Sequence, residues 1–332
     1  TATNLPIMDD KERESVGICY KQDGAEAAER LGHQLVSGNI RERRVQAWQT
    51  FIDQNPNAKL YCFRGGKRSE LAVGWLRASG YNIARIPGGY KALRSYLLTV
   101  VDALPPLMIL GGKTGNGKTD LLASLTRLVD LEKRANHRGS AFGRQIEAQP
   151  SQIDFENLLS IDFLKLGSGS TASPVVVEDE GRLIGRVSLP LPLQAAMKQA
   201  PLVLLEGDME DRVERILKEY IIQQYAQFMA RETDPELALA AHSAVFLAGI
   251  DGIRKRLGGV QHERLRACII NAFAAQAKGD LEQHREWIRD LLSNYYDPMY
   301  DYQLDMKAHR IVFRGDFDAV TEYLCGREAQ AR

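Results

Sequence analysis

The chain has 332 residues, 44% of them hydrophobic and 26% charged, which is typical of a soluble globular protein long enough for two domains. Lys and Arg together number 43, as do Asp and Glu, so any nucleic-acid surface must be a local patch. No apolar run reaches membrane-spanning length and no signal-peptide pattern is present, so no membrane partner is expected. The four cysteines lack the spacing of a disulfide framework or a zinc site, which favours a reducing cytoplasm.

Residues 1–100 alternate between helical and strand patterns, which predicts a small α/β domain. Helices are predicted from apolar residues at helical spacing over residues 24–36, 41–54, 70–79 and 90–99. Short strands are predicted over residues 59–61 and 82–86. The chain opens without a methionine, in what reads as a connection, so we expect a further segment upstream.

The first chemical motif is the loop between the strand at 59–61 and the next helix. It consists of Cys62, Phe63, Arg64, Gly65, Gly66, Lys67, Arg68 and Ser69. A glycine-rich turn that opens a helix surrounds the sulfur with N–H groups, and three cations add positive charge; both effects lower the thiol pKa. The same N–H groups suit an oxyanion. The alternatives are a buried structural cysteine and, because the spacing is C-x5-R-S, a cysteine phosphatase, which no clear general-acid motif supports.

Pro105 and Pro106 mark a domain boundary, because prolines interrupt helices and favour extended backbone. Three buried strands are predicted after it, over residues 107–110, 175–177 and 202–205, with a last strand at 311–313. They alternate with helical segments, which predicts a parallel sheet. A flexible loop is expected at residues 167–171. Residues 101–332 therefore form the second predicted domain, largely helical over about 209–300.

The most informative motif follows the first of these strands. It consists of Gly112, Lys113, Thr114, Gly115, Asn116, Gly117, Lys118 and Thr119, which fit the phosphate-binding loop G-x-x-x-x-G-K-[ST]. A helix is predicted directly after it, over residues 120–131. Backbone N–H groups wrap an anion, Lys118 adds a charge, and Thr119 offers a hydroxyl to Mg²⁺. The motif predicts a phosphate site without saying which compound binds, and the alternative is a glycine-rich turn that matches by chance.

Three acidic residues, Glu178, Asp179 and Glu180, directly follow the strand at 175–177. P-loop proteins carry the carboxylate that organises Mg²⁺ at this place. We expect Glu178 or Glu180 to be linked to Mg²⁺ or to act as a catalytic acid, and the sequence does not choose between them. The alternative is an acidic loop after an ordinary strand.

Several basic residues are candidate contacts to phosphate groups or to a nucleic-acid backbone. They are Arg138, Arg144, Arg182, Arg254, Lys255 and Arg256, with His262, Arg264 and Arg266 close by in sequence. A second basic cluster consists of Lys307, His309, Arg310 and Arg314. A solvated loop or helix surface is the alternative for each of them.

The Cys62 loop resembles the active-site loop of rhodanese-like domains, and Gly88, Gly89 and Tyr90 fit the turn before the last helix of that fold. A rhodanese-like α/β domain followed by a P-loop parallel-sheet domain is similar to the tRNA 2-selenouridine synthase family. The similarity runs through nearly the whole chain and includes residues 4–8, 17–21, 88–94, 111–119, 137–143, 155–157 and 178–185. Family members open with a strand that carries Asp and Arg, so residues 1–100 are expected to lack the first strand of that domain.

The resemblance implies a transferase that acts on 2-thiouridine at the wobble position of the tRNAs for Lys, Glu and Gln. Such enzymes place a geranyl group from geranyl diphosphate on the sulfur and then replace it with selenium from selenophosphate. Cys62 would then handle selenium, the P-loop would bind the diphosphate, and tRNA and a selenophosphate supplier would be partners. A prenyl chain needs an apolar groove near the P-loop, which we expect from the helices after Met209. The alternative is a P-loop nucleotidase or kinase with a rhodanese-like sulfur-carrier or sensor domain.

Overall fold

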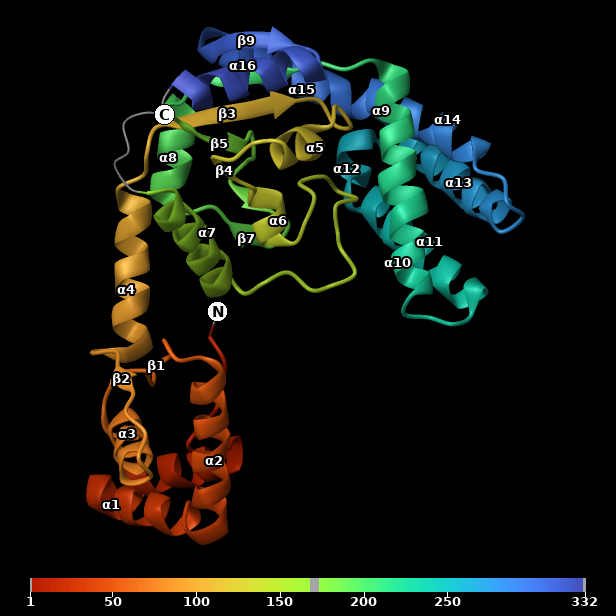
Figure 1. The fold of residues 1–332 in the computed structure, drawn as a ribbon. Helices are drawn as coiled ribbons and strands as arrows, with labels where there is room; N and C mark the ends of the chain where they lie inside the picture. The colour runs from red at the N-terminus through yellow and green to blue at the C-terminus, as the bar shows by residue number, and fades with distance from the viewer. Residues whose placement is uncertain (1, 168–172, 331–332) are drawn as a thin grey trace. The chain divides into compact units, whose positions relative to one another are not determined.

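The computed structural model describes residues 2–167 and 173–330 (Figure 1). The chain divides into two compact units, Thr1–Tyr96 and Leu97–Arg332. Most of the loop expected at residues 167–171 lies outside the described residues. Within the described part, no helix combines the length and the apolar character needed to cross a membrane.

The first unit contains a two-stranded parallel sheet and several helices. Its elements are α1 (Asp10–Leu35), α2 (Gly38–Gln54), β1 (Lys59–Leu60), α3 (Lys67–Ala78) and β2 (Ala84–Arg85), followed by α4 (Gly89–Asp102), which continues into the second unit. Its small core forms where Trp48 stacks on Trp75, with ring centroids 6.1 Å apart, beside the buried Leu76. All six predicted elements are confirmed. Helix α1 is kinked at Gly24 (φ +87°), where the predicted helix begins, and the helical segment before the kink, which Asp9 and Glu12 open with a capping box, was not predicted.

The second unit is built on a five-stranded parallel sheet in the order β4-β5-β3-β8-β9. The strands are β3 (Leu107–Gly112), β4 (Leu128–Val129), β5 (Val175–Glu178), β8 (Leu202–Leu205) and β9 (Ile311–Gly315). A small hairpin is formed by β6 (Leu183–Ile184) and β7 (Val187–Ser188). The four predicted strands and their parallel arrangement are confirmed.

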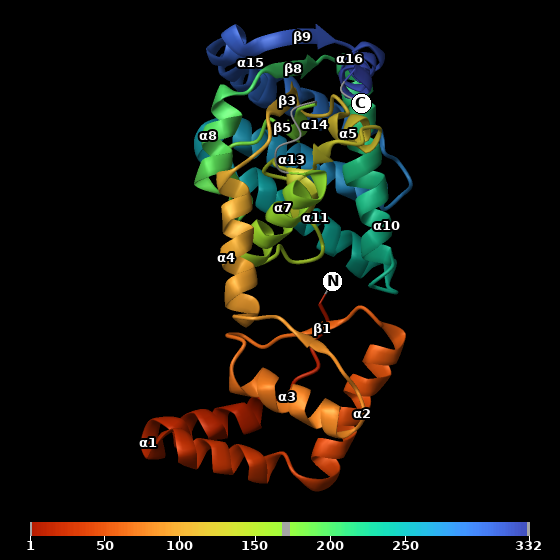
Figure 2. The same cartoon turned by 60° about the vertical axis from the view of Figure 1, so that its left-hand side comes forward.

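Helices cover both faces of this sheet, as the alternation of side chains along β3 requires (Figure 2). Leu107 and Ile109 pack on one face against α7 (Gln152–Leu166) and α8 (Leu191–Gln199). Met108 and Leu110 pack on the other face against α5 (Lys118–Ala123) and α16 (Phe317–Gln330). Burial on both faces explains why these strands read as continuous apolar runs.

The single helix predicted over residues 120–131 is wrong. Helix α5 ends at Ala123, and the edge strand β4 and the short helix α6 (Leu131–Ala135) follow. The Ser124 hydroxyl donates to the Leu121 carbonyl at 2.7 Å and competes with the helical pattern there. Pairing of Leu128 and Val129 with β5 then outweighs the helical periodicity of this segment.

The region after β8 is helical, as predicted, and has a core of its own around Phe246, Ile269 and Trp287. Its helices are α9 (Met209–Ile216), α10 (Gln224–Met229), α11 (Pro235–Gly252), α12 (Arg254–Leu257), α13 (Gly259–Gln276), α14 (Glu282–Leu291) and α15 (Asp297–Lys307). The π-helical segment η1 (Leu217–Gln223) joins α9 to α10, and a second, η2 (Leu292–Tyr296), joins α14 to α15. The 3-10 helix η3 (Ala308–Arg310) precedes β9. Such π-helical segments are frequent at functional sites.

Candidate active site

The P-loop (residues 112–119) connects the carboxyl end of β3 to α5 and forms the floor of a cavity of about 70 Å³. The Lys118 ammonium group donates to the Gly112 carbonyl at 2.8 Å, which holds the lysine along the loop. Gly117 has φ +87°, and a Cβ there would lie 3.0 Å from the Arg215 guanidinium carbon. Only glycine suits both this backbone conformation and the close approach of Arg215. Lys118, Thr119 and Arg215 line the cavity, which therefore has the cationic groups that a diphosphate needs.

Two arginines of α9 fix the loop backbone. The Arg212 guanidinium donates to the Thr114 carbonyl at 2.9 Å, and Arg215 donates to the Gly115 carbonyl at 2.7 Å. Arg212 is buried and forms a two-pronged ion pair with Asp297 of α15, at 2.9 and 2.6 Å. The loop is thus held from two helices that are distant in sequence.

The three acidic residues after β5 lie in different surroundings. Glu178 is buried and accepts hydrogen bonds from the backbone N–H groups of Leu131 and Glu132, so it caps α6. Asp179 forms an ion pair with Lys307 at 2.7 Å. Of these three residues, Glu180 lines the P-loop cavity and the other two do not. The structure therefore places Glu180, and not Glu178, at the cavity, a difference that the sequence does not reveal.

Glu180 shares a hydrogen bond with Glu132, and a Cβ on Gly139 would lie within 2.8 Å of a carboxylate oxygen of each. Burial first, and then the charge of Glu132, raise the pKa of Glu180 to about 8. Burial likewise raises the pKa of Glu132, although Lys118 opposes this effect. Two facing carboxylates beside the Thr119 hydroxyl fit Mg²⁺, because this ion commonly binds one or two carboxylates together with substrate phosphates.

An apolar cavity of about 30 Å³ adjoins the P-loop cavity. Four residues line both cavities: Thr114, Ser140, Ile216 and Tyr220. Beyond them, the apolar cavity is lined by Phe142, Phe246 and Trp287, and by residues of α14 and η2. The apolar cavity therefore lies between the P-loop cavity and the core of the helical region.

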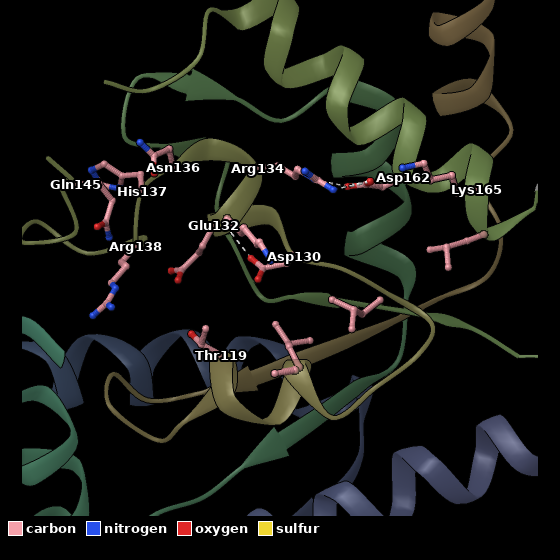
Figure 3. A pocket seen from close by; sticks show the side chains of 15 residues that line it. Thr119, Asp130, Glu132, Arg134, Asn136, His137, Arg138, Gln145, Asp162 and Lys165 are labelled. Carbon is pink, nitrogen blue, oxygen red and sulfur yellow. Dashed lines mark hydrogen bonds and ion pairs between the residues drawn. The ribbon is translucent and has the colours of Figure 1, made fainter. Parts of the chain in front are cut away.

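A larger polar groove of about 550 Å³ adjoins the P-loop cavity at Thr119, Glu132 and Arg138, which line both. These three residues converge at one end of the groove, whereas Arg134, Asp162 and Lys165 lie toward the other (Figure 3). Arg138 forms an ion pair with Glu219 at 2.9 Å and lies over the ring of Tyr220, 4.6 Å from its centroid. Because Tyr220 also lines the apolar cavity, the Arg138–Tyr220 contact is where the three cavities meet.

The Cys62 loop is closed by the turn at Gly88 and Gly89 in the first unit. Tyr90 donates its N–H to the Cys62 carbonyl and Lys91 to the Phe63 carbonyl, both at 2.9 Å. A Cβ on Gly89 would collide with the Cys62 carbonyl oxygen, so this approach of two backbones requires glycine.

Hydrogen bonds set the ionisation of Cys62. Partial burial raises the pKa of its thiol, but hydrogen bonds with the Ser69 side chain and with backbone groups of Ser69, Arg64 and Gly66 outweigh burial and lower it. The sulfur lies 3.4 Å from the Ser69 oxygen. The three cations of the loop are exposed, and Lys67 pairs with Glu29 at 2.9 Å. We expected both the N–H groups and the cations to lower the pKa; the cations are not among the groups that do so.

The other basic candidates are dispersed. Arg138 lines the P-loop cavity, whereas Arg144 and Arg182 are exposed outside its lining residues. Arg254, Lys255 and Arg256 are exposed on α12. Neighbouring cationic groups have partners inside the protein: His262 and Arg266 bind Asp251, Arg264 binds Asp290, Lys307 binds Asp179, and Arg310 donates to the Met197 and Ala200 carbonyls.

Sequence reasoning missed Glu132, Arg212, Arg215, Glu219 and Tyr220 at this site. None of them belongs to the P-loop motif, and all of them except Glu132 are far from it in sequence. The one local signal is the spacing of Arg212 and Arg215, which places both on one side of α9.

A glycine-rich loop at the carboxyl end of a parallel strand, with acidic residues after the neighbouring strand, is the arrangement typical of the P-loop class of proteins. Residues 105–331 match the family model described as the tRNA 2-selenouridine synthase AAA domain. No solved structure matches the chain.

Curated relatives extend this match to nearly the whole chain. It is 49% identical over 325 residues to the tRNA 2-selenouridine synthase of Pseudomonas fluorescens, which covers 97% of this chain and 88% of that protein. It is 49% identical over 326 residues to the protein of that name from Ectopseudomonas mendocina, covering 97% and 87%. It is 47% identical over 334 residues to that of Cupriavidus necator, covering 99% and 90%. The chain therefore belongs to the tRNA 2-selenouridine synthase family.

Replacing Ser69 by alanine should raise the pKa of Cys62, because the hydroxyl stabilises the thiolate. Alkylation of Cys62 by iodoacetamide near neutral pH should slow several-fold and recover at higher pH, as followed by mass spectrometry of the Cys62 peptide. Ser79→Ala, at the end of the same helix, is the matched control and should leave the profile unchanged. An unaltered profile in Ser69→Ala would contradict the hydrogen-bond origin of the shift.

Replacing Glu180 by glutamine should stabilise the protein at higher pH in the absence of Mg²⁺. The folded-state pKa of about 8 exceeds the ordinary value of 4.5, so wild-type stability falls as pH rises between these values. The melting temperature of the variant relative to wild type should therefore increase between pH 5 and pH 8, by roughly 2–4 °C or more. Glu206→Gln, an exposed control, should show no such trend, and a variant less stable than wild type at pH 8 would refute the prediction.

Proposed function

We propose that this chain is a transferase that converts 2-thiouridine at the tRNA wobble position to 2-selenouridine through an S-geranyl-2-thiouridine intermediate. Its substrates are geranyl diphosphate, selenophosphate and the tRNAs for Lys, Glu and Gln. Membership of the family, the P-loop and the Cys62 loop support this proposal. The rhodanese-like character of residues 1–100 is part of the same proposal, and a selenophosphate-producing enzyme would be the partner that supplies selenium.

The observation that carries the proposal is the apolar cavity beside the P-loop cavity. A diphosphate held by Lys118 and Arg215 would present its prenyl chain at Ile216 and Tyr220, where the aromatic wall of Phe142, Phe246 and Trp287 begins. A ribose and base would instead require polar partners in that space. The apolar cavity, at about 30 Å³, is too small for a geranyl chain, so we expect its π-helical walls, η1 and η2, to move apart when the chain enters.

The first reaction is geranyl transfer. The thiocarbonyl sulfur attacks C1 of the geranyl group, the C1–O bond breaks with its electron pair leaving on diphosphate, and the N3 proton of the base is released to water. Lys118, Arg215 and the P-loop N–H groups stabilise the charge that develops on the departing diphosphate. Mg²⁺ held by Thr119, Glu132 and Glu180 would neutralise further charge on these oxygens.

The second reaction replaces sulfur by selenium. The selenium of selenophosphate attacks C2 of the base, the geranyl thiol leaves, and water cleaves the Se–P bond to give phosphate. The lowered pKa of Cys62 and the exposed Arg64 and Arg68 suit a loop that handles an anionic selenium donor.

The test is nucleoside mass spectrometry on an anticodon stem-loop that contains 2-thiouridine. With geranyl diphosphate the protein should yield S-geranyl-2-thiouridine, and with added selenophosphate it should yield 2-selenouridine. Lys118→Ala should slow geranylation by about 10²-fold, the order expected for a lost charge-stabilising donor. Cys62→Ser should abolish selenation while geranylation continues.

Two controls make this test specific. Lys198→Ala on α8 and Cys19→Ser on α1 remove the same side chains outside both sites and should retain both activities. ATP hydrolysis without any modified nucleoside would overturn the proposal in favour of a nucleotidase or kinase.

Replacing Ile216 by phenylalanine should narrow the passage between the P-loop cavity and the apolar cavity. Geranyl diphosphate should then bind at least tenfold more weakly, whereas inorganic pyrophosphate should bind as in wild type, both measured by calorimetry. Ile222→Phe, an exposed position on η1, is the matched control. Equal weakening of both ligands would indicate a damaged P-loop, and unchanged geranyl diphosphate binding would show that the chain lies elsewhere.

A further inference from the structure

The polar groove beside α6 has no role in binding the diphosphate or the prenyl chain. It extends from Thr119, Glu132 and Arg138, at its border with the P-loop cavity, along α6 to Lys165 at the end of α7 (Figure 3). Its volume of about 550 Å³ lies in the range of sites that enclose small organic ligands. Both ends and the walls belong to the second unit, so the groove is complete within it.

We propose that this groove is the binding site of the acceptor nucleotide, the 2-thiouridine of the RNA. This inference rests on the proposed function and adds to it the place where the RNA presents its base. The Arg138–Tyr220 contact carries it, because Arg138 lines the groove and Tyr220 lines the apolar cavity. A base that enters along the groove therefore arrives where the diphosphate ends and the prenyl chain begins, which is where the reacting carbon lies.

The charges of the groove suit one nucleotide with its flanking phosphates. Arg134 is neutralised by Asp162, with one of their hydrogen bonds at 2.7 Å. Lys133 and Lys165 are exposed, and no ion pair of either lysine occurs among the described residues. Asp130 and Glu132 also line the groove, and the two lysines, which have no ion pair in the described part of the chain, are the groups suited to contact the phosphates on either side of the bound nucleotide.

The polar groups near Arg138 suit a pyrimidine edge. The Nδ1 atom of His137 is buried without a hydrogen-bond partner in the described part of the chain, and the Gln145 amide lines the groove beside it. An amide offers both a donor and an acceptor, which matches the N3–H and O4 groups of the base. Leu128 and Leu166 supply apolar surface for the ring. Bases in RNA loops are commonly splayed out and read in this way.

Photo-crosslinking tests the groove without requiring turnover. An anticodon stem-loop with 5-iodouridine at the wobble position is irradiated with the full chain, and the crosslinked peptides are mapped by mass spectrometry. We expect crosslinks within residues 122–145 or 162–166, and their loss when the probe is moved into the stem. Crosslinks confined to α12 and α13, or to the first unit, would overturn the inference.

Charge removal supplies the second measurement. The double variant Lys133→Gln and Lys165→Gln should raise the stem-loop Kd by about tenfold and reduce the salt dependence of binding by about one to two phosphate contacts. The Kd for geranyl diphosphate and the melting temperature should match those of wild type. Lys198→Gln is the matched control and should keep wild-type RNA affinity. Unchanged RNA affinity in the double variant would count against the groove.

The outcomes separate this inference from the proposed function. If wild-type protein modifies the RNA but crosslinks elsewhere and tolerates the double variant, only the groove assignment fails. If wild-type protein crosslinks through the groove but forms no modified nucleoside, the groove is an RNA site and the proposed reaction fails.

Discussion

The buried ion pair between Arg212 and Asp297 is the constraint on which the second unit depends. Taking two charges out of water is costly, and the loss of one partner from such a pair typically destabilises a protein by about 3–5 kcal/mol. The Nε–H group of Arg212 donates to the Thr114 carbonyl, so the ion pair with Asp297 also orients the P-loop. Arg215 adds a second hold at the Gly115 carbonyl. The loop thus keeps its shape before any anion arrives, as a preorganised site requires.

This constraint also explains why the helical region lines the candidate active site. The helix that supplies Arg212 continues into η1, which places Ile216 and Tyr220 at the P-loop cavity, and Asp297 starts the helix that follows η2. The apolar cavity therefore opens beside the loop because the same two chain segments hold the loop and line the cavity. The ion pair of Arg138 with Glu219 ties the border of the polar groove to η1 as well. The P-loop cavity, the apolar cavity and the polar groove consequently meet beside the P-loop.

The sequence was informative where function depends on contiguous residues. The P-loop, the Cys62 loop and the sheet strands each occupy one short segment, so pattern and propensity predicted their presence. Glu132 and Asp297 could not be predicted, because tertiary packing alone brings them to the loop. The choice between Glu178 and Glu180 also lay beyond the sequence, since it depends on the capping of α6 by Glu178. Counting cations overestimated the second basic cluster, because Lys307 and Arg310 are engaged with internal partners that a sequence does not reveal.

The Cys62 loop shows why the origin of a pKa shift matters as much as its direction. If Arg64 and Arg68 lowered the thiol pKa, a bound anion would neutralise their positive charge. The pKa of Cys62 would then rise again when that anion bound. Hydrogen bonds with Ser69 and with the loop backbone lower the pKa of Cys62 instead. The exposed arginines are then available to contact an anionic donor, because they are not the groups that lower the pKa of Cys62. The loop thus combines a thiol whose pKa is lowered by hydrogen bonds with cations that remain exposed, and the proposed handling of an anionic selenium donor requires both properties.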